Sequence, residues 1–266
     1  MEKITSTDRL GQLMQRRSGN VLSIYYTAGY PSLQDTISIA QTLEKSGADL
    51  IEIGMPYSDP VADGPTIQTS NQQALENGMT VEILLEQLES LHGHLQIPVI
   101  LMGYVNPILQ YGVEAFCAAC RQRGVDGLII PDLPVQEYLD RYQSIFTRYD
   151  LHNIYLITPQ TSDERIRWID RHSTSFIYAV SDASITGAKS GISDQQIKYF
   201  KRLQSLKLEH PYLIGFGISD QQTFATACQY AKGAIIGSAF IRVLSQAKEL
   251  STDIGNFVHS VKGVQP

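Results

Sequence analysis

Two carboxylates in one short stretch of the sequence have surroundings that differ. Glu52 interrupts the apolar run Ile51-Glu52-Ile53, and Asp63 follows eleven residues later in a loop that contains three prolines. Because burial of an unpaired carboxylate is costly, its pKa rises, which suits a general acid near neutral pH. A polar loop keeps an aspartate ionised, so the two groups would hold different protonation states in one pocket. The alternative is a Glu52 that is satisfied by a neighbouring arginine or lysine.

Two more aspartates belong to the same set of candidates. Asp59 lies in Ser58-Asp59-Pro60, where an aspartate before proline is typical of a turn. Asp132, in the segment IIPDLP, follows another apolar run, and we expect it to act as a supporting hydrogen-bond acceptor. A purely structural role for Asp132 is the alternative.

Glycine-bearing turns in the C-terminal half are suited to holding an anion. They are Gly215-Phe216-Gly217 and Gly237-Ser238, and a third segment, 181–191, is small, polar and contains glycine. Glycine lets backbone N–H groups approach a phosphate, and a helix amino terminus adds a favourable dipole. Glycine after a strand is also common in simple tight turns. We expect segment 181–191 to be a mobile lid that contributes Gly187 to a phosphate pocket, with an ordinary loop as the alternative.

The elements that must position these residues alternate regularly along the chain. Short apolar runs rich in β-branched residues are each followed by turn residues and then by a stretch of helical periodicity. The eight runs are 21–27, 49–54, 97–104, 125–131, 153–159, 174–180, 211–217 and 232–238. The predicted helices are 33–47, 65–77, 80–91, 113–124, 136–149, 163–172, 194–206, 220–231 and 239–250.

This alternation indicates an α/β fold. Strands that are apolar on both faces and alternate with helices favour a parallel sheet covered by helices, and eight such units match a closed barrel. We therefore expect residues 1–266 to form a single (β/α)₈ TIM barrel, with an extra N-terminal helix and an extra helix after the second strand. Barrels of this kind bind phosphate after the seventh and eighth strands, where the glycine turns lie. A doubly wound sheet is the alternative, but it places its phosphate-binding glycines after the first strand, where this chain has TAGYPS.

The composition excludes several classes of protein. Hydrophobic residues make up 43% of the chain and charged residues 18%, which is ordinary for a globular protein, and the net charge of −6 comes without a basic block that could track nucleic acid. The polar N-terminus and the absence of a long apolar run predict a cytoplasmic protein without a membrane segment. Cys117 and Cys120 have the spacing of half a zinc site, but no second pair accompanies them. A helix face is the preferred interpretation, and we expect no metal.

Five motifs, in order along the chain, resemble those of one family, the alpha subunits of tryptophan synthase. They are IEIGMPYSDPVADGP from Ile51, PDLP from Pro131, ITG from Ile185, GFGIS from Gly215 and GSA from Gly237. The resemblance covers nearly the whole chain. It implies retro-aldol cleavage of indole-3-glycerol phosphate to indole and glyceraldehyde 3-phosphate, without a metal or organic cofactor. It also implies that Glu52 protonates C3 of the indole ring and that Asp63 hydrogen-bonds the ring N–H.

The resemblance extends to further site residues and to a partner. The positions that match the family's indole pocket are Tyr25, Ile67, Met102 and Tyr178. Thr186 matches the family's lid threonine. The positions that match its phosphate pocket are Gly187, Phe216, Gly217, Gly237 and Ser238. The implied partner is the pyridoxal-phosphate-dependent beta subunit, in an α₂β₂ assembly, and the pyridoxal phosphate belongs to that partner. Some residues depart from frequent family choices, namely Tyr25, Met102, and Asp182 and Ser184 in the lid.

Two other functions are weighed beside the lyase. One is a weakly catalytic barrel that binds a phosphorylated ligand and acts mainly as an allosteric partner subunit. The other is a phosphosugar isomerase of similar fold, which would also use paired carboxylates. That reaction needs aspartates near the ends of the first and fifth strands, where this chain has TAGY and TPQT.

Overall fold

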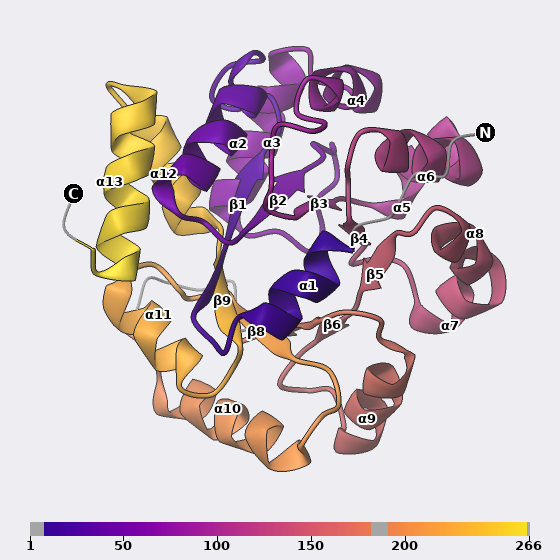
Figure 1. Cartoon of the computed structure of the whole chain (residues 1–266), viewed down its shortest axis with the longest axis vertical. Coiled ribbons are helices and arrows are strands. Elements are labelled where there is room, and N and C mark those ends of the chain that lie inside the picture. Colours follow the sequence, from indigo (N-terminus) through magenta and orange to yellow (C-terminus); the bar gives the residue numbers. More distant parts are fainter. Residues whose placement is uncertain (1–7, 182–190, 265–266) are drawn as a thin grey trace.

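A closed parallel sheet forms the centre of the molecule, and helices surround it (Figure 1). The computed structural model describes residues 8–181 and 191–264. All neighbouring strands pair in parallel, in the order β5-β4-β3-β2-β1-β9-β8-β7-β6. The strands are β1 (Val21–Thr27), β2 (Leu50–Gly54), β3 (Val99–Met102), β4 (Gly127–Ile129), β5 (His152–Ile154), β6 (Leu156–Ile157), β7 (Ile177–Val180), β8 (Tyr212–Gly215) and β9 (Gly233–Ile236).

The two ends of this strand order meet at one residue. β5 pairs with β4, β6 pairs with β7, and only Tyr155 separates β5 from β6 in the chain. The carbonyl of Tyr155 accepts a hydrogen bond from the N–H of Tyr178, at 2.9 Å. β5 and β6 are therefore one bent barrel strand, and the prediction of a TIM barrel with eight strand runs is confirmed.

The helices follow the predicted alternation, with differences at three places. They are α1 (Arg9–Arg16), α2 (Asp35–Ser46), α3 (Pro65–Glu76), α4 (Val81–Glu89), α5 (Val105–Tyr111), α6 (Val113–Gln122), α7 (Val135–Glu137), α8 (Gln143–Arg148), α9 (Asp163–His172), α10 (Asp194–Leu206), α11 (Gln221–Cys228), α12 (Ser238–Gln246) and α13 (Leu250–Lys262). α1 and α3 are the expected extra helices. None of these helices is long and apolar enough to cross a membrane.

The three differences lie between β3 and β5 and after β9. The predicted helix 136–149 is interrupted by a π-helical turn at Tyr138–Tyr142 between α7 and α8. The predicted helix 239–250 stops at Gln246, and α13 begins anew because the Glu249 carboxylate accepts the N–H of Thr252 at its amino terminus. α5 was not expected, since its seven residues carry too short a periodic pattern to be read from the sequence.

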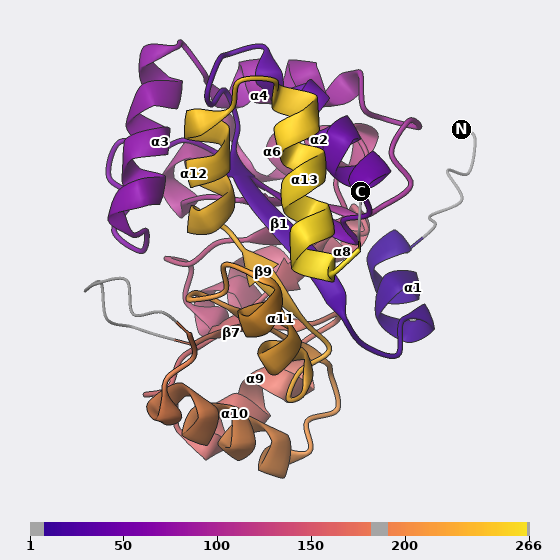
Figure 2. The same ribbon diagram turned by 90° about the vertical axis from the view of Figure 1, so that its left-hand side faces the viewer.

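The apolar core has an outer and an inner part. The outer part lies between the strands and the surrounding helices. The inner part fills the barrel with Leu50, Ile100 and Leu213 among others, and α1 adds Leu10 and Met14 to it. Figure 1 shows α1 across the middle of the ring of strands, and Figure 2 shows it beside the start of β1. α1 therefore closes the amino-terminal opening, and the carboxyl ends of the strands are left as the place for a site.

Candidate active site

Glu52 lies inside the barrel, on β2 between β1 and β3. Its strand neighbours in register are Tyr25 and Ile100, and its side chain is fully buried. The Ser23 hydroxyl donates a hydrogen bond to Oε1 at 2.7 Å, whereas Oε2 has no partner within residues 8–181 and 191–264. Burial raises the pKa of Glu52 from 4.5 to about 7, and the Ser23 hydrogen bond acts in the opposite direction. Within the described residues, no arginine or lysine forms an ion pair with the Glu52 carboxylate. The expectation of a buried carboxylate with a raised pKa is therefore confirmed.

Asp63 is more enclosed than expected. Only 6% of its surface is exposed, because the loop after β2 folds back against α3 and against the residues that follow β3. Its Oδ2 accepts hydrogen bonds from the Tyr104 hydroxyl at 3.1 Å and from the Asn71 amide at 3.4 Å. Burial raises the pKa of Asp63 from 3.8 to about 6, and the two hydrogen bonds oppose that rise.

Asp63 is therefore buried, but its environment is more polar than that of Glu52, with two hydrogen-bond donors instead of one. The predicted order of the two groups holds, because the pKa of Asp63, at about 6, lies below the pKa of Glu52, at about 7. Near pH 7 the pocket thus holds a mostly ionised aspartate and a glutamate that is partly protonated. The donors that set these values, Ser23, Asn71 and Tyr104, were missed in the sequence, since each reaches its carboxylate from a separate element.

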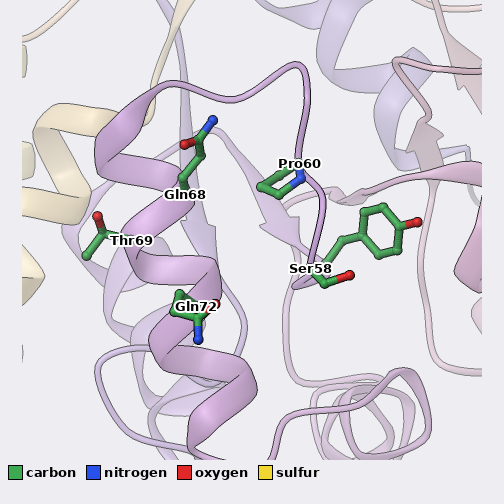
Figure 3. Close-up of a pocket in the computed structure, with 6 residues that line it drawn as sticks. Ser58, Pro60, Gln68, Thr69 and Gln72 are labelled. Atoms are coloured by element: carbon green, nitrogen blue, oxygen red, sulfur yellow. The ribbon is translucent and has the colours of Figure 1, made fainter.

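The loop that carries Asp63 is held from both sides. The N–H of Ala62 donates to the Tyr104 hydroxyl at 3.0 Å, and the Gln68 amide donates to the carbonyl of Asp63 at 2.8 Å. The Tyr57 and Tyr104 rings stack with centroids 5.2 Å apart. Figure 3 shows the side chains that line a hollow between this loop and α3, with Ser58 and Pro60 on the loop and Gln68, Thr69 and Gln72 on the helix. Neither Glu52 nor Asp63 lines that hollow, so it is distinct from the candidate site.

Two tyrosines and two aliphatic side chains are the predicted contacts of the indole ring. Tyr25 and Tyr178 are 5% exposed, Ile67 is 8% exposed, and Met102 is half-buried at the end of β3. Burial raises the pKa of both phenols, and the negative charges of Glu52 and Asp63 raise it further. Tyr25 and Tyr178 therefore lie near both carboxylates, Ile67 lies near Tyr25 at the end of β9, and Met102 is in register with Gly54 at the end of β2.

Glycines make room for these side chains at three strand ends. A Cβ added to Gly54 would lie 2.2 Å from the Tyr25 hydroxyl, and one added to Gly215 would lie 2.3 Å from the Tyr178 hydroxyl. A Cβ at Gly237 would approach Tyr25 to 3.4 Å and Ile67 to 3.7 Å. Larger residues at Gly54 or Gly215 would displace the phenols, so these glycines shape the pocket.

The predicted phosphate residues lie at the ends of the neighbouring strands β8 and β9. Phe216 and Gly217 both have positive φ, at 67° and 76°, and Phe216 packs edge-on against Tyr178. Gly237 precedes α12 without a capping side chain, and Ser238 is the first residue of that helix. The first N–H groups of a helix have no partner within the helix, and such groups can hold an anion. Thr186 and Gly187 lie outside the described residues.

The remaining candidates have structural partners. Asp132 is exposed and accepts the N–H of Val105 at 3.0 Å, at the start of α5. The carbonyl of Asp59 accepts the N–H of Val61 at 2.9 Å, as in a turn. Cys117 and Cys120 are buried on α6, and the described residues contain no group of three metal-ligating side chains. The interpretation of the cysteine pair as a helix face is confirmed.

The chain is similar to known proteins over nearly its whole length. A family model described as tryptophan synthase alpha chain matches residues 11–263. The chain is 57% identical to the tryptophan synthase alpha chain of Flavobacterium johnsoniae, over 96% of this chain and 100% of that protein. It superposes on tryptophan synthase subunit alpha from Legionella pneumophila with a TM-score of 0.86 at 31% identity, covering 97% and 98% of the two chains. A tryptophan synthase structure from M. tuberculosis in its aminoacrylate-bound form gives a TM-score of 0.83 at 29% identity, covering 97% and 100%.

Proposed function

The chain belongs to the family of tryptophan synthase alpha chains, and from that premise we propose that Glu52 and Asp63 are its catalytic pair. Members of this family are the lyase subunits of tryptophan synthase. The chain is therefore a carbon–carbon lyase of tryptophan biosynthesis, which cleaves indole-3-glycerol phosphate to indole and glyceraldehyde 3-phosphate. This assignment sets the phosphosugar isomerase aside.

One observation carries the assignment of roles. Glu52 is fully buried, has one oxygen without a partner in the described chain and has a pKa of about 7, so it can give up a proton and take one back. Asp63 has the lower pKa and two hydrogen-bond donors, which suit it to remain a carboxylate. Glu52 is therefore suited to act as the acid, and Asp63 is suited to act as the anion.

The chemical step follows from this division. Glu52 transfers its proton to C3 of the indole ring, and the positive charge that develops on the ring is stabilised by the Asp63 carboxylate at the ring N–H. The bond from C3 to the hydroxyl-bearing carbon then breaks, and its electron pair returns to the ring. The Glu52 carboxylate accepts the hydroxyl proton as the aldehyde forms, which restores the acid.

The other residues bind and orient the substrate. We assign Tyr25, Ile67, Met102 and Tyr178 to the indole ring, because they line the mouth around the carboxylates. The phosphate binds at the ends of β8 and β9, through Phe216, Gly217, Gly237 and Ser238, where backbone N–H groups are free to donate. The family resemblance adds Thr186 and Gly187, and Asp132 supports the rim through Val105.

The test is indole release from indole-3-glycerol phosphate by two charge-neutral variants. Glu52→Gln and Asp63→Asn are each expected to lower turnover by about 10³-fold, because one loses the proton and the other the charge that stabilises the ring. Circular dichroism checks that both variants are folded. Near-normal turnover in both folded variants would exclude the assigned roles.

The family implies a beta-subunit partner, and we propose an α₂β₂ assembly. Two large apolar side chains are exposed on the rim of the candidate site: Val61 at 81%, in the loop after β2, and Leu109 at 48%, on α5 after β3. Both segments follow the carboxyl ends of strands, which is the end of the barrel that holds the candidate site. Sedimentation of the mixed subunits measures the stoichiometry, and indole release with and without the beta subunit separates the lyase from a mainly allosteric subunit.

We also propose that residues 1–266 form one domain that works in the cytoplasm. α13, near one end of the chain, packs against α2, and α1, near the other end, closes the barrel, which supports one folded unit. Cys117, Cys120 and Cys228 are free thiols, which suits a reducing compartment. Two separate unfolding transitions in calorimetry would contradict the single domain.

A further inference from the structure

The two oxygens of Glu52 are unequal, and Ser23 is the cause. Ser23 lies on β1, opposite Leu50 in register, while Glu52 lies opposite Tyr25. The side chains of Ser23 and Glu52 therefore point into the barrel one layer apart, on adjacent strands. The Ser23 hydroxyl donates to Oε1 at 2.7 Å, and both residues are fully buried.

We infer that Ser23 is a positioning residue for the lyase reaction, which holds Oε1 of Glu52 against β1 so that Oε2 is the oxygen that exchanges the proton with the substrate. The inference rests on the proposed role of Glu52. The carboxyl group turns about a bond with a broad torsional preference. A single donor on one oxygen therefore decides which oxygen is left for chemistry.

The residues around Ser23 are apolar and offer its hydroxyl no other hydrogen-bond partner within the described residues. Its register partners on β2 and β9 are Leu50 and Ile235, so it occupies an apolar layer of the barrel interior. A buried hydroxyl is costly unless it is hydrogen-bonded. Within the described residues, the hydrogen bond to Glu52 is the one that its side chain makes. An alanine would fill this position without that cost, so the serine is explained by the carboxylate above it.

The same hydrogen bond adjusts the acid strength. Burial raises the pKa of Glu52 to about 7, and the Ser23 hydroxyl opposes the rise because it stabilises the ionised form. Without the hydroxyl both oxygens would lack a donor, and the proton would be held more tightly. Ser23 thus keeps Glu52 able to release its proton to C3 and recover one from the hydroxyl group.

The experiment measures kcat/KM for indole release against pH in three folded variants of the full chain. Ser23→Ala should lower the maximum by about 10-fold and move the alkaline limb to higher pH, since that limb reports the ionisation of Glu52. Ser23→Thr, which keeps a hydroxyl, should restore the limb to its original pH. The matched control is Ser175→Ala, which removes a buried hydroxyl that has no partner in the described residues and lies outside the site. It should leave the profile unchanged.

Two results would overturn the inference. One is an alkaline limb that stays in place in Ser23→Ala, and the other is a limb in Ser23→Thr that matches Ser23→Ala. If Ser23→Ala does not fold, Ser23→Cys, which keeps the size but donates weakly, takes its place with the same expected shift. Glu52→Gln keeps the two proposals distinct. If Glu52→Gln keeps its activity, the proposed role of Glu52 as the acid is wrong. If Glu52→Gln loses its activity and the pH profile of Ser23→Ala is unaltered, only the role of Ser23 is wrong.

Discussion

Buried carboxylates at the two ends of the barrel differ in whether they have a cationic partner. At the amino-terminal end, Asp126 accepts two hydrogen bonds from the Arg9 guanidinium, at 3.0 and 2.6 Å, and Asp49 forms ion pairs with Arg17 and with Lys262. At the carboxyl end, Glu52 and Asp63 have no cationic partner in the described parts of the chain.

The difference separates two uses of one residue type. A paired carboxylate ties α1 and α13 to the strands, and loss of its cation leaves the buried carboxylate without a charge partner. An unpaired carboxylate lowers stability but holds a pKa near neutrality, which is what proton transfer needs. Pairing, rather than burial, therefore distinguishes the carboxylates that close the fold from the two that we propose act on substrate.

The largest effect on stability is expected from removal of Arg9. Arg9→Met keeps the apolar stem but leaves Asp126, which is 5% exposed, with the N–H of Val99 as its remaining donor. The unfolding free energy should fall by about 3 kcal/mol, because one partner of a buried pair is lost. Urea unfolding measures this change, and indole release per folded molecule should be unchanged.

A surface pair provides the control for that experiment. Arg141→Met breaks the exposed pair between Arg141 and Glu137 on neighbouring helical turns, at 3.1 Å. Its expected cost is below about 0.5 kcal/mol. Equal losses in the two variants would mean that the amino-terminal pairs do not stabilise the barrel as the comparison requires.

The next effect has the opposite sign and depends on pH. The pKa of Glu52 is raised from 4.5 to about 7 in the folded chain, so between these values the folded state binds a proton that the unfolded state has lost. Stability therefore falls as pH rises through this window. Glu52→Gln should be more stable than the wild type by about 3 kcal/mol at pH 8 and equal to it near pH 4. Urea unfolding at both pH values measures the difference.

Glu137→Gln is the matched control for the change of charge. Its side chain is 39% exposed and pairs with Arg141 on the surface, so its substitution should alter stability by less than about 0.5 kcal/mol at either pH. A Glu52→Gln variant that is less stable than the wild type at pH 8 would show that the buried carboxylate stabilises the fold, and the contrast between the two ends would not hold.

Much of the fold could be predicted because its signals are local. Apolar runs and helical periodicity identified the strand segments and most helices, and the position of Glu52 in such a run predicted its burial. α13 was missed because its start depends on the capping carboxylate of Glu249 rather than on a change in apolar pattern. The split of the fifth strand at Tyr155 has no sequence signal that we recognised.

The environment of the site was harder to predict, because it is assembled from distant segments. Asp63 lies in a loop of polar appearance, yet Tyr104 comes 41 residues later and encloses it. Ser23 precedes its partner Glu52 by 29 residues. Such contacts depend on strand register and loop path, which a single sequence does not state. The sequence was enough to propose which residues carry the chemistry. The hydrogen-bond donors that adjust their pKa values could be identified only from the structure.

The smallest effect tests whether Asp63 is tuned by its hydroxyl donor. For the wild type, kcat/KM against pH should be bell-shaped, with an acid limb near pH 6 from Asp63 and an alkaline limb near pH 7 from Glu52. The Tyr104 hydroxyl donates to Asp63 at 3.1 Å and favours its ionised form, so Tyr104→Phe should move the acid limb to higher pH. The expected loss of kcat/KM is about fivefold near pH 6, which corresponds to about 1 kcal/mol.

Tyr57→Phe is the control. It removes a hydroxyl from the stacked neighbouring ring, which does not touch Asp63, and should leave both limbs in place. An acid limb that Tyr104→Phe leaves unmoved would mean that burial alone sets the ionisation of Asp63, and the two carboxylates would then differ in position but not in tuning.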